Sequence, residues 1–121
     1  MPATNLVQET ITDDGYIAPK ALARVLRVTQ TELSNITGLR REAVSKRLRI
    51  RSLSTQKRLR ETVEILNRVS DWCGGPVQAL AWFRSQPLPS FGDLTAEDLL
   101  KAGRADALRT YLRRVAEGGY A

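Results

Sequence analysis

The stretch 30–51, QTELSNITGLRREAVSKRLRIR, constrains the fold of this chain more than any other segment. Thr29 directly precedes this stretch and Glu32 lies within it. The two have the spacing of a capping box, in which they close the first turn of a helix by reciprocal hydrogen bonds. Gly38 follows about two turns later and is able to end that helix in a left-handed conformation. The sequence therefore predicts a short helix that ends in a glycine turn.

A second helix is expected directly after this turn, with Val44 and Leu48 one turn apart on its inner face. Its outward side chains are cationic or form hydrogen bonds, and they are Arg40, Arg41, Ser45, Lys46 and Arg49. A short helix, a glycine turn and a basic helix are typical of a helix-turn-helix, which places its second helix in the major groove of DNA. We therefore predict that these five side chains bind DNA, with Lys46 and Arg49 at phosphates and the other three near base edges.

One position departs from the usual helix-turn-helix pattern. If Gln30 is counted first, the eighteenth position is normally apolar, but here it is Arg47. We expect the neighbouring Leu48 to serve in its place, which implies a slightly rotated second helix. The alternative interpretation is a pair of helices that only pack against each other.

The charge distribution favours a polyanionic partner. The net charge is +6, and residues 40–60 hold nine lysines and arginines against a single acid, Glu42. Each cation that neutralises a phosphate releases counterions, so this window is suited to nucleic acid. The alternative is a solvated helix face, which is the common fate of a run of charges.

The composition argues against an enzyme. The chain has no histidine, which is the commonest general base and metal ligand, and Cys73 is its single cysteine. We therefore expect no catalytic residues, no metal and no cofactor. A lone cysteine fits the reducing cytoplasm, and no apolar run approaches the length of a membrane span.

We predict an all-α fold, because no segment alternates with a period of two over the length of a strand. Residues 1–15 are expected to form a flexible arm with a short ordered piece near Leu6 and Ile11. Residues 16–73 are expected to form a helix-turn-helix domain with a long connecting helix, and residues 74–121 a small helical domain. The long helix is placed at about residues 55–72, with Leu59, Val63, Leu66 and Val69 on its apolar face.

Two segments of the second half are not explained by DNA binding. The loop QPLPSFGD at 86–93 is too rich in proline and glycine to be helical, and we expect its prolines to hold Leu88 and Phe91 in an extended segment. Large apolar groups on such a loop either fold back or meet a partner. The tail GGYA at 118–121 similarly places a tyrosine after two glycines, although a frayed end is its usual interpretation.

The second half resembles a known family. The segments that carry the resemblance to the Xre/MbcA/ParS toxin-binding domain are ALAWFRSQP at 79–87, FGD at 91–93, LL at 99–100, Gly103 and GGYA at 118–121. The preceding helix-turn-helix has the order and spacing of an Xre-like domain, and the match looks closest to ParS-type antitoxins. Two positions depart from the family pattern: Ala96 stands where proline is frequent, and Phe91 where leucine is commoner.

This resemblance implies a function. Such antitoxins bind a RES-domain toxin that consumes NAD, by degrading it or by transferring ADP-ribose. They block its active site and typically repress their own operon. The resemblance implies a homodimer within a toxin–antitoxin hetero-oligomer, and operator DNA as a second partner. The residues expected to contact the toxin are Trp82, Pro87, Leu88, Pro89, Phe91, Gly92, Asp93, Leu94, Gly118, Gly119, Tyr120 and Ala121.

Two alternatives remain at this point. The chain could be a stand-alone helix-turn-helix repressor with a small C-terminal dimerisation domain, or a toxin-binding protein whose basic helix does not bind DNA. For Trp82, the residue type by itself is also more typical of a core position than of a binding site.

Overall fold

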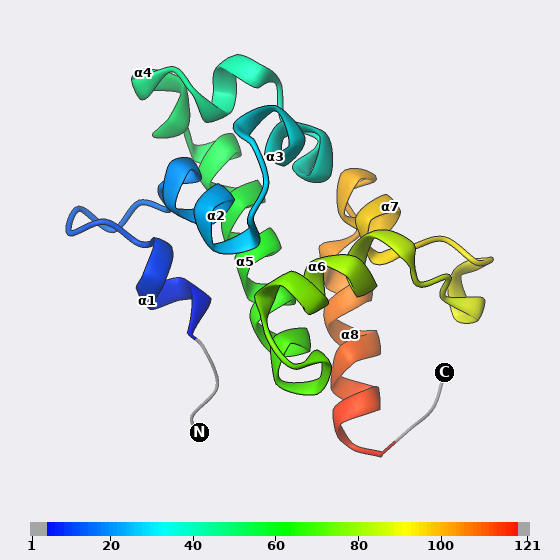
Figure 1. The fold of residues 1–121 in the computed structure, drawn as a ribbon. Helices are drawn as coiled ribbons and strands as arrows, with labels where there is room; N and C mark the ends of the chain where they lie inside the picture. The colour runs from blue at the N-terminus through cyan, green and yellow to red at the C-terminus, as the bar shows by residue number, and fades with distance from the viewer. Residues whose placement is uncertain (1–4, 119–121) are drawn as a thin grey trace.

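The computed structural model describes residues 5–118 and is all-α in that range (Figure 1). Its two 3₁₀ turns are η1 (Arg41–Val44) and η2 (Pro89–Phe91). Two isolated β-bridges, Ile11 to Ile17 and Leu88 to Leu94, are the extended pairings among these residues. The α-helices are α1 (Leu6–Thr10), α2 (Pro19–Leu26), α3 (Gln30–Thr37), α4 (Arg47–Ile50), α5 (Leu53–Cys73), α6 (Pro76–Ser85), α7 (Ala96–Lys101) and α8 (Ala105–Ala116).

Local signals set the ends of α3 as predicted. The Thr29 hydroxyl accepts a hydrogen bond from the Glu32 N–H at 3.0 Å, and the Glu32 carboxylate accepts one from the Thr29 N–H at 3.0 Å. Gly38 then ends the helix in the left-handed region, with φ of 74°. The predicted capping box and glycine turn are therefore confirmed.

The long helix α5 lies at the centre of the molecule, and the other helices pack around it (Figure 1). Its predicted apolar face is buried, and its fully buried apolar side chains are Leu59, Val63, Ile65, Leu66 and Val69. They belong to one hydrophobic cluster that includes Leu22 from α2, Leu99 from α7 and Leu108 from α8. Residue 74 therefore ends a helix, while the core continues from the first half into the second.

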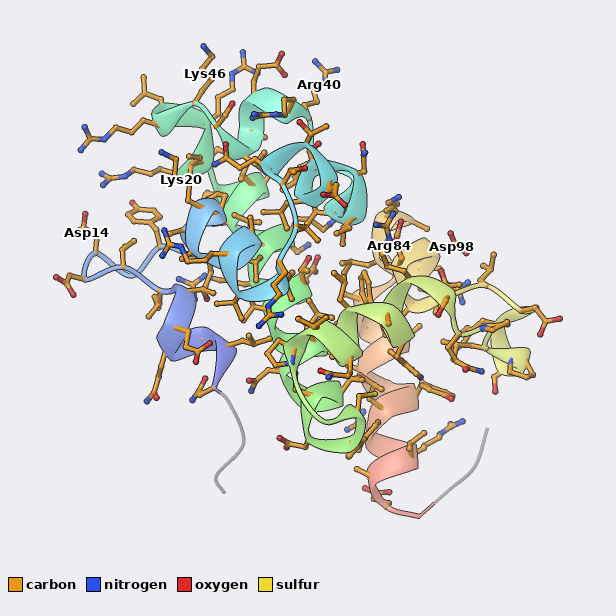
Figure 2. All side chains as sticks on the ribbon, in the orientation of Figure 1. Asp14, Lys20, Arg40, Lys46, Arg84 and Asp98 are labelled. Atoms are coloured by element: carbon orange, nitrogen blue, oxygen red, sulfur yellow. The ribbon has the colours of Figure 1, made fainter. Side chains whose placement is uncertain are left out.

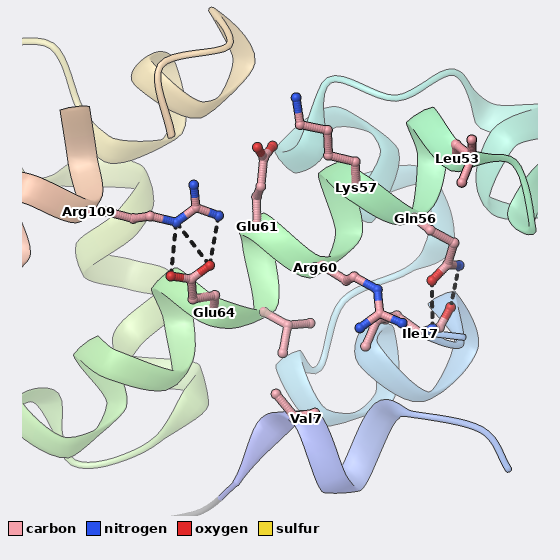
Figure 3. A pocket seen from close by; sticks show the side chains of 10 residues that line it. Val7, Ile17, Leu53, Gln56, Lys57, Arg60, Glu61, Glu64 and Arg109 are labelled. Atoms are coloured by element: carbon pink, nitrogen blue, oxygen red, sulfur yellow. Dashed lines mark hydrogen bonds and ion pairs between the residues drawn. The ribbon is translucent and has the colours of Figure 1, made fainter. Parts of the chain in front are cut away.

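Within the arm predicted at residues 1–15, the structure contains the short ordered piece that was expected near Leu6 and Ile11. Helix α1 belongs to this piece, and Leu6 is fully buried. The Leu6 N–H donates to the Asn67 side-chain oxygen at 2.9 Å. The side-chain amide of Gln56 accepts a hydrogen bond from the Ile17 N–H at 2.8 Å and donates one to the Ile17 carbonyl at 3.1 Å (Figure 3). Polar side chains of α5 therefore fix this segment, and no periodicity in its own short sequence indicates that.

The prediction of a continuous second helix is wrong. The segment forms η1 and α4, and Lys46 between them is extended, with φ of −89° and ψ of 122°. Val44 is fully buried as expected, but Leu48 is 87% exposed and does not lie on an inner face. The Ser45 hydroxyl donates to the Arg41 carbonyl at 2.9 Å, a local bond that competes with regular helix. With Arg47 in the normally apolar position, Val44 alone anchors the segment before the half-buried Ile50.

Candidate nucleic-acid and protein-binding surfaces

A cluster of exposed cations covers η1 and α4 at one end of the molecule, where Figure 2 labels Arg40 and Lys46. We call this cluster the cationic tip, and it consists of Arg40, Arg41, Lys46, Arg47 and Arg49. Four of its members were predicted to bind DNA, and the structure places them together. Arg47 was not among the predicted DNA-binding residues, because it stands at a normally apolar position of the motif, although its charge in a basic window was a visible signal.

The cations of the tip have no carboxylate within 4 Å among residues 5–118, whereas five arginines outside the tip each have one: Arg51, Arg58, Arg68, Arg84 and Arg109. Arg109 binds Glu64 at 2.8 Å, and Arg51 binds Asp14 at 3.0 Å. Within the tip, Arg41 donates through Nε to the Thr31 hydroxyl at 3.1 Å. The tip therefore presents positive charge that this part of the chain does not neutralise.

Ser45 was predicted to lie near DNA bases with Arg40 and Arg41. Its side chain is exposed in the middle of the tip, but its hydroxyl already donates to the Arg41 carbonyl. The hydroxyl oxygen remains able to accept a hydrogen bond. Its clearest role in the structure is to bend the backbone between η1 and α4.

A second surface is formed by residues 88–94, which we call the lobe. It projects from the body of the molecule between α6 and α7 (Figure 1). Its backbone is closed by hydrogen bonds from the Leu88 N–H to the Leu94 carbonyl at 2.9 Å and from the Asp93 N–H to the Leu88 carbonyl at 3.0 Å. Gly92 and Asp93 both adopt positive φ, 66° and 65°, which allows the chain to reverse direction. The expectation of a segment held extended by prolines is therefore wrong.

Leu88 and Phe91 are turned inward. Leu88 is 1% exposed and belongs to the core, so it is not available as a surface contact in this structure. Phe91 is half-buried and packs edge-on against Tyr111, with ring centroids 5.9 Å apart. The Arg104 guanidinium lies 5.4 Å from the Phe91 ring centroid. Of the two alternatives for these side chains, folding back holds, and both attach the lobe to the core and to α8.

The remaining predicted toxin contacts divide into three groups. Pro87, Pro89, Gly92, Asp93 and Leu94 are brought together and exposed, with Leu94 at 40%. Trp82 is half-buried on α6 and packs against the core. Gly118 follows α8 with φ of 89°, while Gly119, Tyr120 and Ala121 lie outside the described residues.

Ion pairs hold the base of the lobe. Glu97 is 8% exposed, and its carboxylate receives Arg84 Nε at 2.8 Å and Lys101 Nζ at 2.7 Å. This pairing joins α6, which precedes the lobe, to α7, which follows it. The backbone N–H and the hydroxyl of Thr95 form hydrogen bonds with Asp98, and these bonds lower the pKa of that carboxyl. Both ends of the lobe are therefore fixed by charge and by a helix cap.

A groove of about 620 Å³ runs along α5, bordered by α1 and α8 (Figure 3). Four of its charged side chains are engaged within the chain: Arg60, Glu61, Glu64 and Arg109. Glu64 accepts bonds from Arg109 at 2.8 to 3.0 Å, which raise the pKa of the guanidinium, and Arg60 donates to the Gly15 carbonyl. These groups serve as structural links between helices rather than as a free acid–base pair.

No protein-family model, curated protein or solved structure matches this chain. Across residues 5–118, no helix has the length and apolar character needed to cross a membrane.

Proposed function

We propose that this chain is the antitoxin of a type II toxin–antitoxin system and acts in the cytoplasm. In this proposal the lobe and the C-terminal residues bind a RES-domain toxin and occlude its NAD-consuming active site. The cationic tip binds operator DNA, so that the protein represses its own operon. The active unit is a homodimer within a toxin–antitoxin hetero-oligomer. The class of the toxin rests on the sequence resemblance.

The observation that carries the toxin-binding part is the lobe itself. Its backbone is closed by its own hydrogen bonds, its base is held by Glu97, and Leu94 stays exposed beside two prolines. A surface that is ordered before binding loses little conformational entropy on association. An apolar group on a projecting, ordered loop is suited to insertion into a concave partner.

Toxin binding is tested by a matched pair of substitutions. Leu94 in the lobe and Val77 on α6 are each 40% exposed, so Leu94→Asp and Val77→Asp perturb the fold to a similar, small extent. We expect Leu94→Asp to abolish protection in cells that co-express the toxin, and Val77→Asp to retain it. Equal melting temperatures serve as the folding control. Full protection by Leu94→Asp would place the toxin interface elsewhere.

The role of the C-terminal residues is tested by truncation. Removal of residues 118–121 leaves α8 intact, because that helix ends at Ala116. The truncated chain is expected to fold and bind DNA normally while failing to protect cells from the toxin. Retained protection would show that these residues do not contribute to inhibition.

The tip supports DNA binding through its unneutralised charge. Each phosphate contact contributes about 0.9 to the slope of log K against log salt concentration on duplex DNA. Replacing Arg40, Lys46 and Arg49 by alanine is expected to lower that slope by about 3 and to weaken binding at least tenfold. Toxin neutralisation should be unaffected, because the lobe is formed by other elements.

The control removes the same kind of charge from another surface. Arg113 and Arg114 are exposed on α8, and alanine at both is expected to leave the slope nearly unchanged, whereas a pure net-charge effect of two cations would lower it by about two-thirds as much as the three-residue tip variant. Gel shifts on the promoter region at several salt concentrations measure both variants. If the two variants lose affinity equally, DNA binding depends on net charge and the tip has no special role.

A stand-alone repressor is the second candidate, and the exposed tip favours it independently of the lobe. The two candidates differ in co-expression with the neighbouring gene: a stand-alone repressor binds the promoter but neutralises no toxin.

A further inference from the structure

The tip has the wrong shape for the usual helix-turn-helix reading mode. A reading helix contacts bases from residues on successive turns within the major groove. Helix α4 has four residues and is therefore about 6 Å long, and the extended Lys46 separates it from η1. Helix α4 therefore presents a single helical turn to DNA rather than a face that continues over several turns. DNA bound to this surface meets a narrow projection.

That projection carries one large apolar side chain. Leu48 is 87% exposed, whereas Val44 on one side is fully buried and Ile50 on the other is half-buried. Exposed Arg47 and Arg49 flank it in sequence, with Lys46 one residue further away. An isolated exposed leucine is ordinary on a protein surface. This one is distinguished by its position between cations that no carboxylate within the described range neutralises.

We propose that Leu48 is a wedge that inserts between adjacent base pairs in the minor groove, with Arg47 and Arg49 holding the phosphates on either side. This inference rests on the proposed DNA binding by the tip. Phosphate contacts by the flanking arginines bring the leucine against the duplex, where the stacked bases provide an apolar site. Apolar wedges of this kind unstack one base step and kink the duplex by roughly 20–90°.

The wedge predicts a preference for particular steps. Pyrimidine–purine steps such as TA unstack at the lowest cost, so a duplex with a central TA step should bind more tightly than one with an A-tract at the same place.

An anionic membrane is the other polyanionic surface with an apolar interior. The tip offers it a single apolar side chain, whereas helices that bind membranes present a continuous apolar face.

The experiment uses two short duplexes that differ only in the central step, one with TA and one with an A-tract. A 2-aminopurine at that step reports unstacking by its fluorescence, and dyes at the duplex ends report bending by energy transfer. We expect the full chain to raise the fluorescence, to shorten the end-to-end distance and to prefer the TA duplex by roughly tenfold.

Leu48→Ala is expected to lose all three effects while retaining the salt dependence of binding, because the cations remain. Leu53→Ala is the matched control, since Leu53 is 92% exposed at the start of α5 and lies outside the tip. Leu53→Ala should behave like the unaltered chain, and Leu48→Met should restore the kink. Neither alanine change should alter the melting temperature, because both side chains are already exposed.

Three results with the variants would overturn the wedge. The first is kinking by Leu48→Ala equal to that of the unaltered chain, and the second is an equal loss of kinking in the Leu53 control. The third is Leu48-dependent binding to phosphatidylserine vesicles without any effect on DNA. Tight, salt-dependent binding without unstacking leaves the proposed DNA function intact and removes only the wedge. A chain that binds neither duplex overturns both proposals.

Discussion

At the scale of single residues, Gly38 has the strictest requirement. Its φ is +74°, and a Cβ there would lie 3.1 Å from Lys101 Cγ and 3.3 Å from Arg58 Nη1. The Arg58 group cannot move freely, because Nη1 donates to the Thr37 carbonyl at 2.6 Å. The turn between α3 and η1 is therefore determined both by its own backbone and by contact with α5 and α7.

We predict that Gly38→Ala destabilises the fold by more than the roughly 1–2 kcal/mol that left-handed backbone costs an alanine. Gly92→Ala is the control, since Gly92 has a similar φ of +66° and a Cβ at that position would meet no atom within 4 Å. Urea unfolding measures the free energy of both variants. Equal losses would mean that the close approach at Gly38 carries no cost.

Asp98 makes a residue-scale prediction about pH. Hydrogen bonds from the Thr95 backbone N–H and hydroxyl lower its pKa in the folded state. The stabilisation is therefore complete above the unfolded pKa of about 3.9 and is lost as pH falls through the lower folded value. Asp98→Asn should be less stable than the unaltered chain at neutral pH, and the difference should shrink in acid. Thermal melts across this range test it, and a constant difference would contradict it.

At the scale of elements, the lobe contains two leucines that differ in exposure, although both lie in the same short loop. Leu88 is 1% exposed within the core and Leu94 is 40% exposed at the surface. We predict that Leu88→Ala lowers the free energy of unfolding by about 2–5 kcal/mol, and that Leu94→Ala changes it by about 0.5 kcal/mol or less. Chemical denaturation measures both. A loss of toxin binding in Leu88→Ala would then reflect a disordered lobe rather than a lost contact.

At the scale of the whole molecule, one core links the two predicted domains. The hydrophobic cluster runs from Leu6 in α1 to Leu112 in α8 and includes the buried face of α5. Small chains with one core usually unfold in a single cooperative transition. We predict coincident transitions for tryptophan fluorescence, which reports on Trp72 and Trp82, and for hydrogen exchange in α2 and α3. Two separate transitions would show that the halves fold independently.

Local sequence signals predicted α3 and α5 correctly. The capping box at Thr29 and the glycine at position 38 act on backbone groups within a few residues, so the local sequence alone determines them. The apolar face of α5 followed from helical periodicity for the same reason. The cations of the tip were also visible in the sequence, because a dense charge run remains at the surface in almost any fold.

Burial was decided only by the tertiary structure. Leu48 and Leu88 have the same side chain, but one is almost fully exposed and the other almost fully buried. Their positions depend on which segments compete for the limited space around α5, and that competition involves residues far apart in the chain. Leu6 and Ile17 are likewise held by Asn67 and Gln56, which lie 61 and 39 residues away. The sequence by itself determined where α3 and α5 lie and where charge gathers, since those are short-range effects. The fold determined which side chains a partner meets.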